Sequence, residues 1–144
     1  MLNEPTDEQL NCLPRMGETA KVPFEEKIIH LHFYIPGTDT PPQEIFGPIA
    51  LQPPGSYRLY LLRNSYHWYI AEYDGVDLLY GYANLGDDYL AEWGDISFSE
   101  LCEPGPYGIE VFNDTLWKPK TFSEAMQERK SRTDGKSYPW SKLG

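Results

Sequence analysis

Two histidines are spaced so that both imidazoles could reach one metal ion. His30 and His32 are two residues apart in an alternating apolar segment, so on a strand they project from the same face. His67, or a carboxylate such as Glu72, would complete the site if the strands that carry them are neighbours. The competing interpretation is a pair of surface or hydrogen-bonded histidines beside Tyr34. We favour it, because two ligands alone do not make a metal site.

Three carboxylates are also spaced so that they could act together. Glu72 and Asp74 share a strand face and Asp77 follows across a turn, so the three are expected to lie close to one another. Such a cluster binds a divalent cation or supplies a general acid with a raised pKa. The simpler interpretation is a solvated hairpin end, in which Asp74 serves the turn and Glu72 faces water. The pair Asp87 and Asp88 lacks the ligand spacing of a calcium loop.

The motifs of common enzyme classes are absent from the sequence. It contains no Gly-x-Ser-x-Gly elbow, phosphate-binding P-loop, dinucleotide fingerprint or His-Glu-x-x-His helix. Cys12 and Cys102 stand outside any Cys-x-x-Cys pattern, and we expect them to be buried free thiols. The sequence therefore predicts no cofactor and no bound metal, and it favours a protein that is not an enzyme.

Charge is distributed unevenly along the 144 residues, whose formal net charge is −10. The segment from Asn64 to Trp117 holds eleven acidic residues and no Lys or Arg. Beyond Met126 the sign reverses, with Glu128 and Asp134 outnumbered by Arg129, Lys130, Arg132, Lys136 and Lys142. So acidic a protein is unsuited to binding a phosphate backbone directly, and it suits a basic partner.

Aromatic residues are interleaved with these acids. They are Trp68, Tyr69, Tyr73, Tyr80, Tyr82, Tyr89 and Trp93. About half of the rings must line the core if the strands alternate, and the others would anchor a basic protein surface that the carboxylates attract. The predicted partner-binding residues are Glu72, Asp74, Asp77, Asp87, Asp88, Glu92, Trp93 and Asp95.

The strands that carry these residues are predicted from apolar and aromatic patterning. We expect strands over Lys27–Ile35, Tyr57–Leu62, Tyr66–Tyr73 and Val76–Ala83, with a short one near Ile109–Phe112. Arg63–Ser65 and Asp74-Gly75 are expected to form hairpin turns, the second of type I′. The last three long strands would then form an antiparallel meander.

Three capping boxes predict helix starts. Thr6 with Gln9, Ser97 with Glu100, and Thr121 with Glu124 have the required spacing, and the last helix is expected to run to about Lys130. The fold class is therefore α+β, an antiparallel meander sheet with short N-terminal and C-terminal helices and a long Pro-rich loop. We expect one acidic domain over residues 1–130, with a Pro-rich inserted loop at 36–56 and a basic flexible tail at 131–144.

The order of motifs resembles a known bacterial family. The segments that carry the resemblance are Pro23–Ile29, His32-Phe33-Tyr34, Trp68–Gly75, Tyr80-Gly81-Tyr82, Glu92-Trp93-Gly94, Ser97–Leu101 and Lys118-Pro119-Lys120. Together they cover most of residues 6–126 and are similar to the uncharacterised family called domain of unknown function 2958. The resemblance implies a bacterial or phage protein, often carried on mobile elements near antirestriction genes, with no catalytic residues to transfer. This sequence departs from that pattern through the residues between 38 and 65.

The sequence thus favours a non-enzymatic acidic protein-binding module. Its partner would be a basic protein surface, such as the nucleic-acid site of a host defence or DNA-processing protein, bound by charge mimicry. The alternative is a small metal- or carboxylate-dependent enzyme built on the His/Glu/Asp cluster. No apolar run is long enough to cross a membrane and the first residues lack a signal-peptide pattern, so we expect a cytoplasmic protein.

Overall fold

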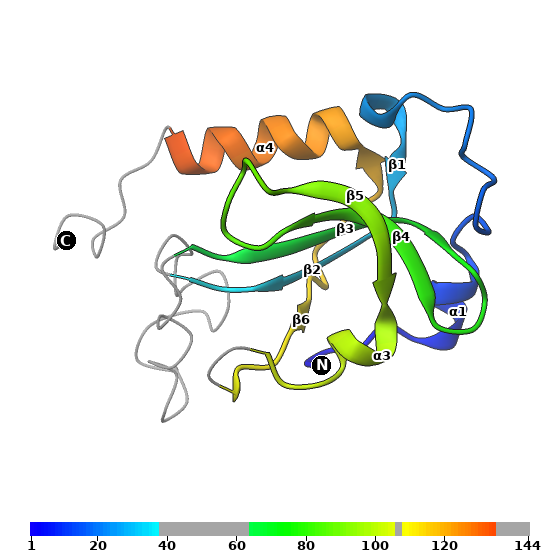
Figure 1. Ribbon diagram of the computed structural model, residues 1–144, viewed down its shortest axis with the longest axis horizontal. Helices are drawn as coiled ribbons and strands as arrows, with labels where there is room; N and C mark the ends of the chain where they lie inside the picture. The colour runs from blue at the N-terminus through cyan, green and yellow to red at the C-terminus, as the bar shows by residue number, and fades with distance from the viewer. Residues whose placement is uncertain (38–63, 106–107, 135–144) are drawn as a thin grey trace, which may run out of the picture.

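A five-stranded antiparallel sheet forms the centre of the protein (Figure 1). The computed structural model describes residues 1–37, 64–105 and 108–134. The strands are β2 (Leu31–Ile35), β3 (Tyr66–Tyr73), β4 (Leu78–Asn84), β5 (Glu92–Ser97) and β6 (Phe112–Asn113), and their spatial order is β5-β4-β3-β2-β6. This arrangement confirms the predicted α+β class and its antiparallel meander.

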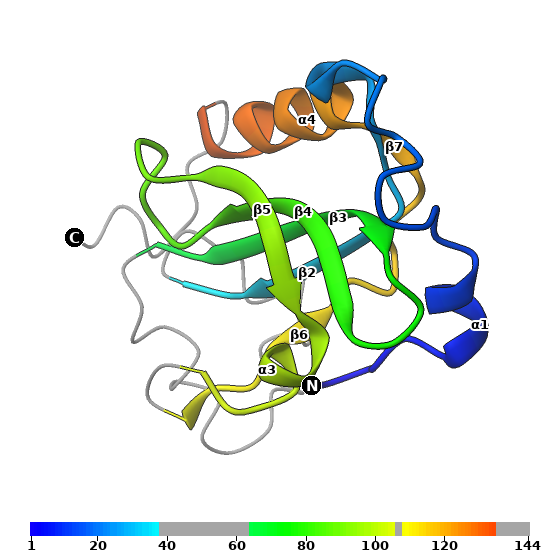
Figure 2. The same ribbon diagram turned by 45° about the vertical axis from the view of Figure 1, so that its right-hand side comes forward.

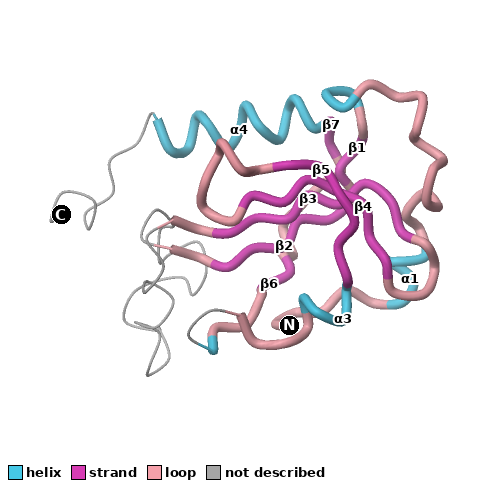
Figure 3. Tube along the Cα trace, viewed as in Figure 1, coloured by secondary structure: helices cyan, strands magenta, loops and turns pink. Residues whose placement is uncertain are grey.

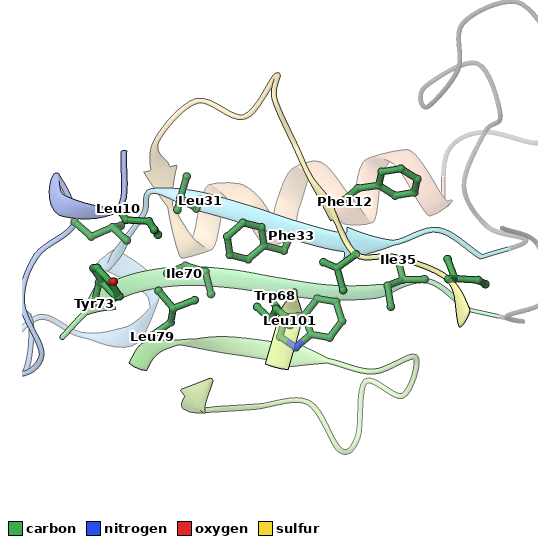
Figure 4. Close-up of a cluster of buried hydrophobic side chains, with 13 residues drawn as sticks. Leu10, Leu31, Phe33, Ile35, Trp68, Ile70, Tyr73, Leu79, Leu101 and Phe112 are labelled. Carbon is green, nitrogen blue, oxygen red and sulfur yellow. The ribbon is translucent and has the colours of Figure 1, made fainter. Parts of the chain in front are cut away.

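Each face of the sheet carries its own layer. Helix α4 (Phe122–Asp134) lies across one face, and α1 (Asp7–Asn11), α3 (Phe98–Leu101) and the chain leading to β6 lie on the other side (Figures 1 and 2). The larger apolar cluster, on the α3 side, centres on Phe33, Ile70 and Leu79, as Figure 4 shows. The smaller cluster joins Ile29 and Tyr69 to Ala125 of α4.

The predicted strand Lys27–Ile35 is divided at His30. Its first part, β1 (Ile28–Ile29), leaves the main sheet and pairs with β7 (Lys120–Thr121), the strand that leads into α4. Ile29 consequently packs under α4, whereas Leu31 packs in the larger cluster on the opposite face. The period-two pattern predicted extended backbone correctly, but it could not show that the chain changes sheets.

The helix caps follow the sequence closely. The Thr6 hydroxyl accepts from the Gln9 amide and the Gln9 side chain accepts from the Thr6 amide, which confirms the first capping box. Ser97 and Thr121 likewise accept from the amides of Glu100 and Glu124. Helix α4 extends to Asp134, so the chain remains helical for four residues of the predicted flexible tail, and residues 135–144 lie outside the described part.

Two turn and strand predictions were wrong. Gly75 has a φ of 90° but Asp74 does not have a positive φ, so the turn is not type I′; instead one carboxylate oxygen of Asp74 accepts from the amides of residues 76, 77 and 78. The neighbours of β3 are β2 and β4, so the predicted hairpin through Arg63–Ser65 does not supply either partner. The predicted strand Tyr57–Leu62 and most of the Pro-rich loop lie outside the described residues.

Other elements differ from the prediction for local reasons. Strand β5 is not among the predicted strands, because Gly94 and Asp95 are poor strand formers. Pairing with β4 from Leu78 to Ala83 overrides that preference. A single 3-10 turn, η1 (Phe24–Glu26), precedes β1. Both cysteines are free as expected, but neither is buried: Cys12 is exposed and Cys102 is half-buried. No helix in the described ranges has the length and apolarity needed to cross a bilayer.

A register shift in β3 decides which face its side chains reach. The pairing with β4 slips by one residue between Ile70 and Glu72. Trp68 and Ile70 point into the larger cluster, and so does Tyr73, which strict alternation would have placed on the other face. The bulge therefore turns Glu72 away from the core that contains Ile70.

Gly81 of β4 and Gly94 of β5 provide a test of how closely β4 packs against the backbone of β3 beside the bulge. A Cβ on Gly81 would lie 2.1 Å from the Tyr69 carbonyl oxygen, whereas a Cβ on Gly94 would meet nothing within 4 Å. We expect Gly81→Ala to lower the free energy of unfolding by about 3 kcal/mol, because the backbone beside the bulge must move. Gly94→Ala is the matched control and should change it by less than about 0.5 kcal/mol. Urea denaturation measures both, and equal effects would contradict the role assigned to Gly81.

Candidate functional site

Glu72 is a buried anchor for the segment that precedes β1. Only 3% of the residue is exposed. Its carboxylate accepts hydrogen bonds from the Gly17 amide at 2.8 Å, the Thr19 amide at 3.0 Å and the Thr19 hydroxyl. Burial by itself would raise the pKa of Glu72, but the bonds from Thr19 and Gly17 and the charge of Lys27 lower it overall. Glu72 is therefore neither a general acid nor a partner-binding residue.

Lys27 completes this buried arrangement. The residue is 4% exposed, and its ammonium donates to the carbonyl and the hydroxyl of Thr19. Thr19 thus stands between a buried cation and the buried carboxylate of Glu72. A buried pair of opposite charges linked in this way costs far less than either charge alone, so the three residues fix the loop at 17–19 on the sheet.

Asp74 and Asp77 organise the end of the β3–β4 hairpin. Asp74 caps its own turn, and the amide hydrogen bonds, first of all that of Val76, lower its pKa. Asp77 accepts from the Ser97 hydroxyl at 2.8 Å and the Ser99 amide at 2.8 Å, and the Ser97 bond is the main cause of its lowered pKa. Glu72 is engaged with Gly17 and Thr19, and no three such side chains converge within residues 1–37, 64–105 and 108–134, so the predicted three-carboxylate cluster does not form.

The histidines form a hydrogen-bonded chain. His32 Nδ1 lies 2.9 Å from Asp114 Oδ2, His32 Nε2 lies 2.8 Å from His67 Nδ1, and His67 Nε2 lies 2.6 Å from the Ser65 hydroxyl. With Asp114 ionised and both rings neutral, each group donates to the next, from Ser65 through to Asp114. Tyr69 stacks on His32 at a centroid distance of 4.8 Å. The chain joins β2, β3 and the segment after β6. The sequence favoured hydrogen-bonded histidines for the pair His30 and His32; His32 is hydrogen-bonded, but its partner is His67 and not His30.

The residues of the alternative metal site, His30, His32 and Glu72, are not arranged around a common point. His30 lies where β1 gives way to β2, so the alternation that would have aligned it with His32 is interrupted. Burial lowers the pKa of His30, which favours a neutral ring. Glu72 is engaged by Gly17 and Thr19. Over residues 1–37, 64–105 and 108–134, no three His, Cys, Asp or Glu side chains converge as a metal site would require.

The loop between β4 and β5 presents apolar side chains to solvent. Leu85, Tyr89 and Leu90 are 55%, 98% and 77% exposed. Around them the backbone is held by polar contacts: the Asp87 carboxylate accepts from the Tyr89 amide, and Asn84 accepts from the Gly86 amide. We call residues 85–91 the hairpin loop; it is the pink segment that joins β4 and β5 in Figure 3.

Asp88 links the hairpin loop to strand β4 and to helix α4. Its Oδ1 atom accepts from the Asn84 side chain at 2.7 Å and lies 3.7 Å from a guanidinium nitrogen of Arg129 on α4. Asn84 itself is 1% exposed, so the base of the loop is rigidly held. The exposed side chains of Leu85, Tyr89 and Leu90 therefore project from a loop whose base is held by hydrogen bonds.

Trp93 has a structural role that the sequence did not reveal. Its indole is half-buried against Phe24 at 5.1 Å and Phe122 at 5.0 Å between ring centroids. It therefore joins β5 to η1 and α4, and it is not the exposed anchor that we predicted. Tyr89 takes that position, and its place in a loop of small and acidic residues was the signal for it.

The predicted partner-binding residues divide into two groups. Asp74 and Asp77 lie at one end of the seven-residue strand β4 and Asp87 and Asp88 at the other, about 20 Å away at ~3.3 Å per residue. Glu92 and Asp95 of β5 are exposed as well; Glu92 pairs with Ala83 beside the loop, whereas Asp95 lies opposite Tyr80, on the other face of the strand. We call this surface, formed by Asp87, Asp88, Tyr89, Leu90, Glu92 and Asp95, the acidic edge. It is the candidate functional site.

Comparisons with protein-family models, with curated proteins and with solved structures find no match for this chain. The resemblance to domain of unknown function 2958 therefore remains an expectation.

Replacement of Glu72 by Gln tests the anchor. One amide oxygen cannot serve three donors, so we expect Glu72→Gln to lower the free energy of unfolding by about 1–3 kcal/mol. Because the folded pKa is lowered, the contribution of wild-type Glu72 is fully present above its unfolded value of about 4.3 and is lost as the pH falls through the folded pKa. Urea unfolding measured from neutral to acidic pH should therefore show that the free energy of unfolding falls less steeply with pH in the variant than in the wild type. Glu92→Gln, on exposed β5, should leave stability within about 0.5 kcal/mol.

Chemical labelling tests whether the histidine chain activates a serine. Ser65 is only 2% exposed, so a fluorophosphonate should not modify it, although His67 lies within hydrogen-bond distance of its hydroxyl. Intact-mass measurement after incubation with the probe provides the readout, with a known serine hydrolase as positive control. Labelling that disappears in Ser65→Ala would contradict this expectation and indicate a nucleophilic serine, which neither interpretation of the sequence included.

Proposed function

We propose that this protein is a non-enzymatic protein-binding module that docks its acidic edge on a Lys/Arg-rich protein surface. The observation that carries the proposal is the hairpin loop, where Tyr89 is 98% exposed and Leu90 77% exposed beside Asp87 and Asp88. No Lys or Arg occurs between Asn64 and Trp117, and Arg129 of α4 approaches this part of the chain at Asp88.

The loop has the physical properties of a binding surface. Tyrosine is enriched among interface residues that contribute most to affinity, and aliphatic neighbours exclude water around it. Asn84 and Asp87 hold the loop through hydrogen bonds, so little backbone freedom remains to be lost on binding. Carboxylates around the apolar centre would accelerate encounter with a basic surface and disfavour acidic partners.

The nature of the partner follows from the sign of the charge. A basic protein surface is often one that binds nucleic acid, and the resemblance to domain of unknown function 2958 implies an origin on mobile elements beside antirestriction genes. We propose that the partner is a host defence or DNA-processing protein whose nucleic-acid site is covered by the acidic edge. Glu92 and Asp95 of β5 extend the negative charge beyond the loop and support this proposal.

A pull-down with matched variants tests the proposal. Wild-type protein, Tyr89→Ser/Leu90→Ser and Val76→Ser/Leu116→Ser are immobilised and exposed to bacterial lysate at low salt, and recovered proteins are identified by mass spectrometry. Val76 and Leu116 are 83% and 85% exposed but lie outside the acidic edge, so the second variant controls for general stickiness. We expect a basic protein to be retained by the wild type and the control and lost, at least about tenfold, with the Tyr89 and Leu90 variant.

Salt dependence and competition by DNA separate docking by charge from mimicry of nucleic acid. Because exposed charges are screened beyond about 10 Å at ~0.1 M salt, retention of the partner should fall steeply as NaCl is raised. Duplex DNA should displace the partner if its nucleic-acid site is the docking surface. Retention unaffected by both the Tyr89 and Leu90 substitutions and the salt would refute the proposed function; salt-sensitive binding that DNA does not compete would remove only the mimicry.

A further inference from the structure

Strand β5 has one free edge. It lies at the end of the strand order, outside β4 (Figure 2), and no described strand pairs with its outer side. Free edges usually carry a bulge, a proline or a lysine that discourages pairing with another chain. From Glu92 to Ser97 none of these three devices is present.

The hydrogen-bond register shows which amides face outward. The Phe98 amide donates to the Asp77 carbonyl, which fixes the hydrogen-bonded pairs as every second pair of the β4–β5 ladder. Gly94 opposite Gly81 and Ile96 opposite Leu79 are therefore hydrogen-bonded pairs. The backbone N–H and C=O groups of Trp93 and Asp95 consequently point away from β4, toward the free edge.

The space beside this edge is open. A Cβ at Gly94 would meet nothing within 4 Å. On the α4 side, a groove of about 610 Å³ is lined by Phe24, Tyr80 and Asp95, and also by Lys21, Lys27 and Glu72. A strand added to β5 would place alternate side chains over this groove.

Asp95 is the exposed acidic residue of this groove. Lys21 and Lys27 also line it, and Glu72, whose carboxylate accepts from Gly17 and Thr19, is only 3% exposed. The Phe24 ring is half exposed at 50%, but Lys27 Nζ already lies 5.6 Å from its centroid and Trp93 packs against it. An ammonium or guanidinium group is attracted by carboxylates, so Asp95 is the group that would meet a basic side chain here.

We propose that the free edge of β5 binds an extended Lys/Arg-rich segment of the partner protein by strand addition, with the outward amides of Trp93 and Asp95 pairing to it. Charge complementarity selects the occupant, because Glu92 and Asp95 project from opposite faces of the strand, so a basic side chain on either face of the added strand meets a carboxylate. Backbone hydrogen bonds supply register, and Asp95 binds a basic side chain at the groove. This inference rests on the proposed function and specifies how that surface holds its partner.

A defined peptide tests the edge directly, whatever the identity of the partner. The probe is a capped peptide of about eight residues with alternating Lys and Val, long enough for a typical strand. The control peptide has the same side chains but is N-methylated at every residue, so its charge is kept and its backbone donors are removed. Residue-resolved NMR of the full chain follows amide shifts and hydrogen exchange. We expect shifts and slowed exchange at Trp93 and Asp95 with the first peptide only.

Two protein variants separate backbone pairing from charge. Asp95→Asn removes the carboxylate, and Asp95→Pro removes both the carboxylate and the outward N–H at a position where an edge strand tolerates proline. Asp95→Pro should bind the peptide about tenfold more weakly than Asp95→Asn, with the rest of the amide spectrum confirming that each variant is folded.

The outcomes are distinct from those of the pull-down. Equal binding of the two peptides, or equal affinities of the two variants, would show attraction by charge alone and overturn strand addition while leaving the proposed function standing. Absence of shifts on β5 would also overturn it. The proposed function fails separately, if the partner ignores the Tyr89 and Leu90 substitutions and the salt.

Discussion

The structure depends on one irregularity in its central strand, the register slip between Ile70 and Glu72 of β3. The slip turns Tyr73 into the larger apolar cluster and leaves Glu72 facing Thr19 and Lys27. Without it, strict alternation would place a carboxylate among the side chains around Ile70, at a cost of several kcal/mol. Because Glu72 instead receives three hydrogen bonds, the bulge converts that cost into an attachment point for the segment at 17–19.

The attachment has consequences on the α4 side of the sheet. The fixed segment leads through η1 and Lys27 into β1, which pairs with β7 and so sets the entry of the chain into α4. Trp93 closes the same layer by packing between Phe24 and Phe122. Because Trp93 is half-buried against these rings, the side chains that β5 exposes are the carboxylates of Glu92 and Asp95. The backbone edge of β5 is free, and the hairpin loop carries the exposed ring of Tyr89.

The acidic residues therefore have two roles, one in holding the fold and one at the surface. Glu72, Asp74 and Asp77 accept hydrogen bonds that hold the fold, and their lowered pKa values are the signature of that role. Glu92 and Asp95 are exposed on β5 and contribute to the field that a partner would meet. An acidic composition is thus not a measure of binding surface, because a carboxylate that is buried and hydrogen-bonded within the fold, as Glu72 is, does not reach a partner.

Sequence by itself determined the features that depend on near neighbours. The capping box at Thr6, the N-cap bond at Ser97, the extended segments around β2 to β4, the α+β class and the unbroken acidity from Asn64 to Trp117 follow from local patterns. Their causes lie within a few residues. Only the tertiary structure decided the bulge, the change of sheet at His30, the neighbours of β3 and the meeting of His32 with Asp114. These rest on pairings between residues far apart in the chain, where alternation fixes a period but not a register, and one slipped residue sends a side chain to the opposite face.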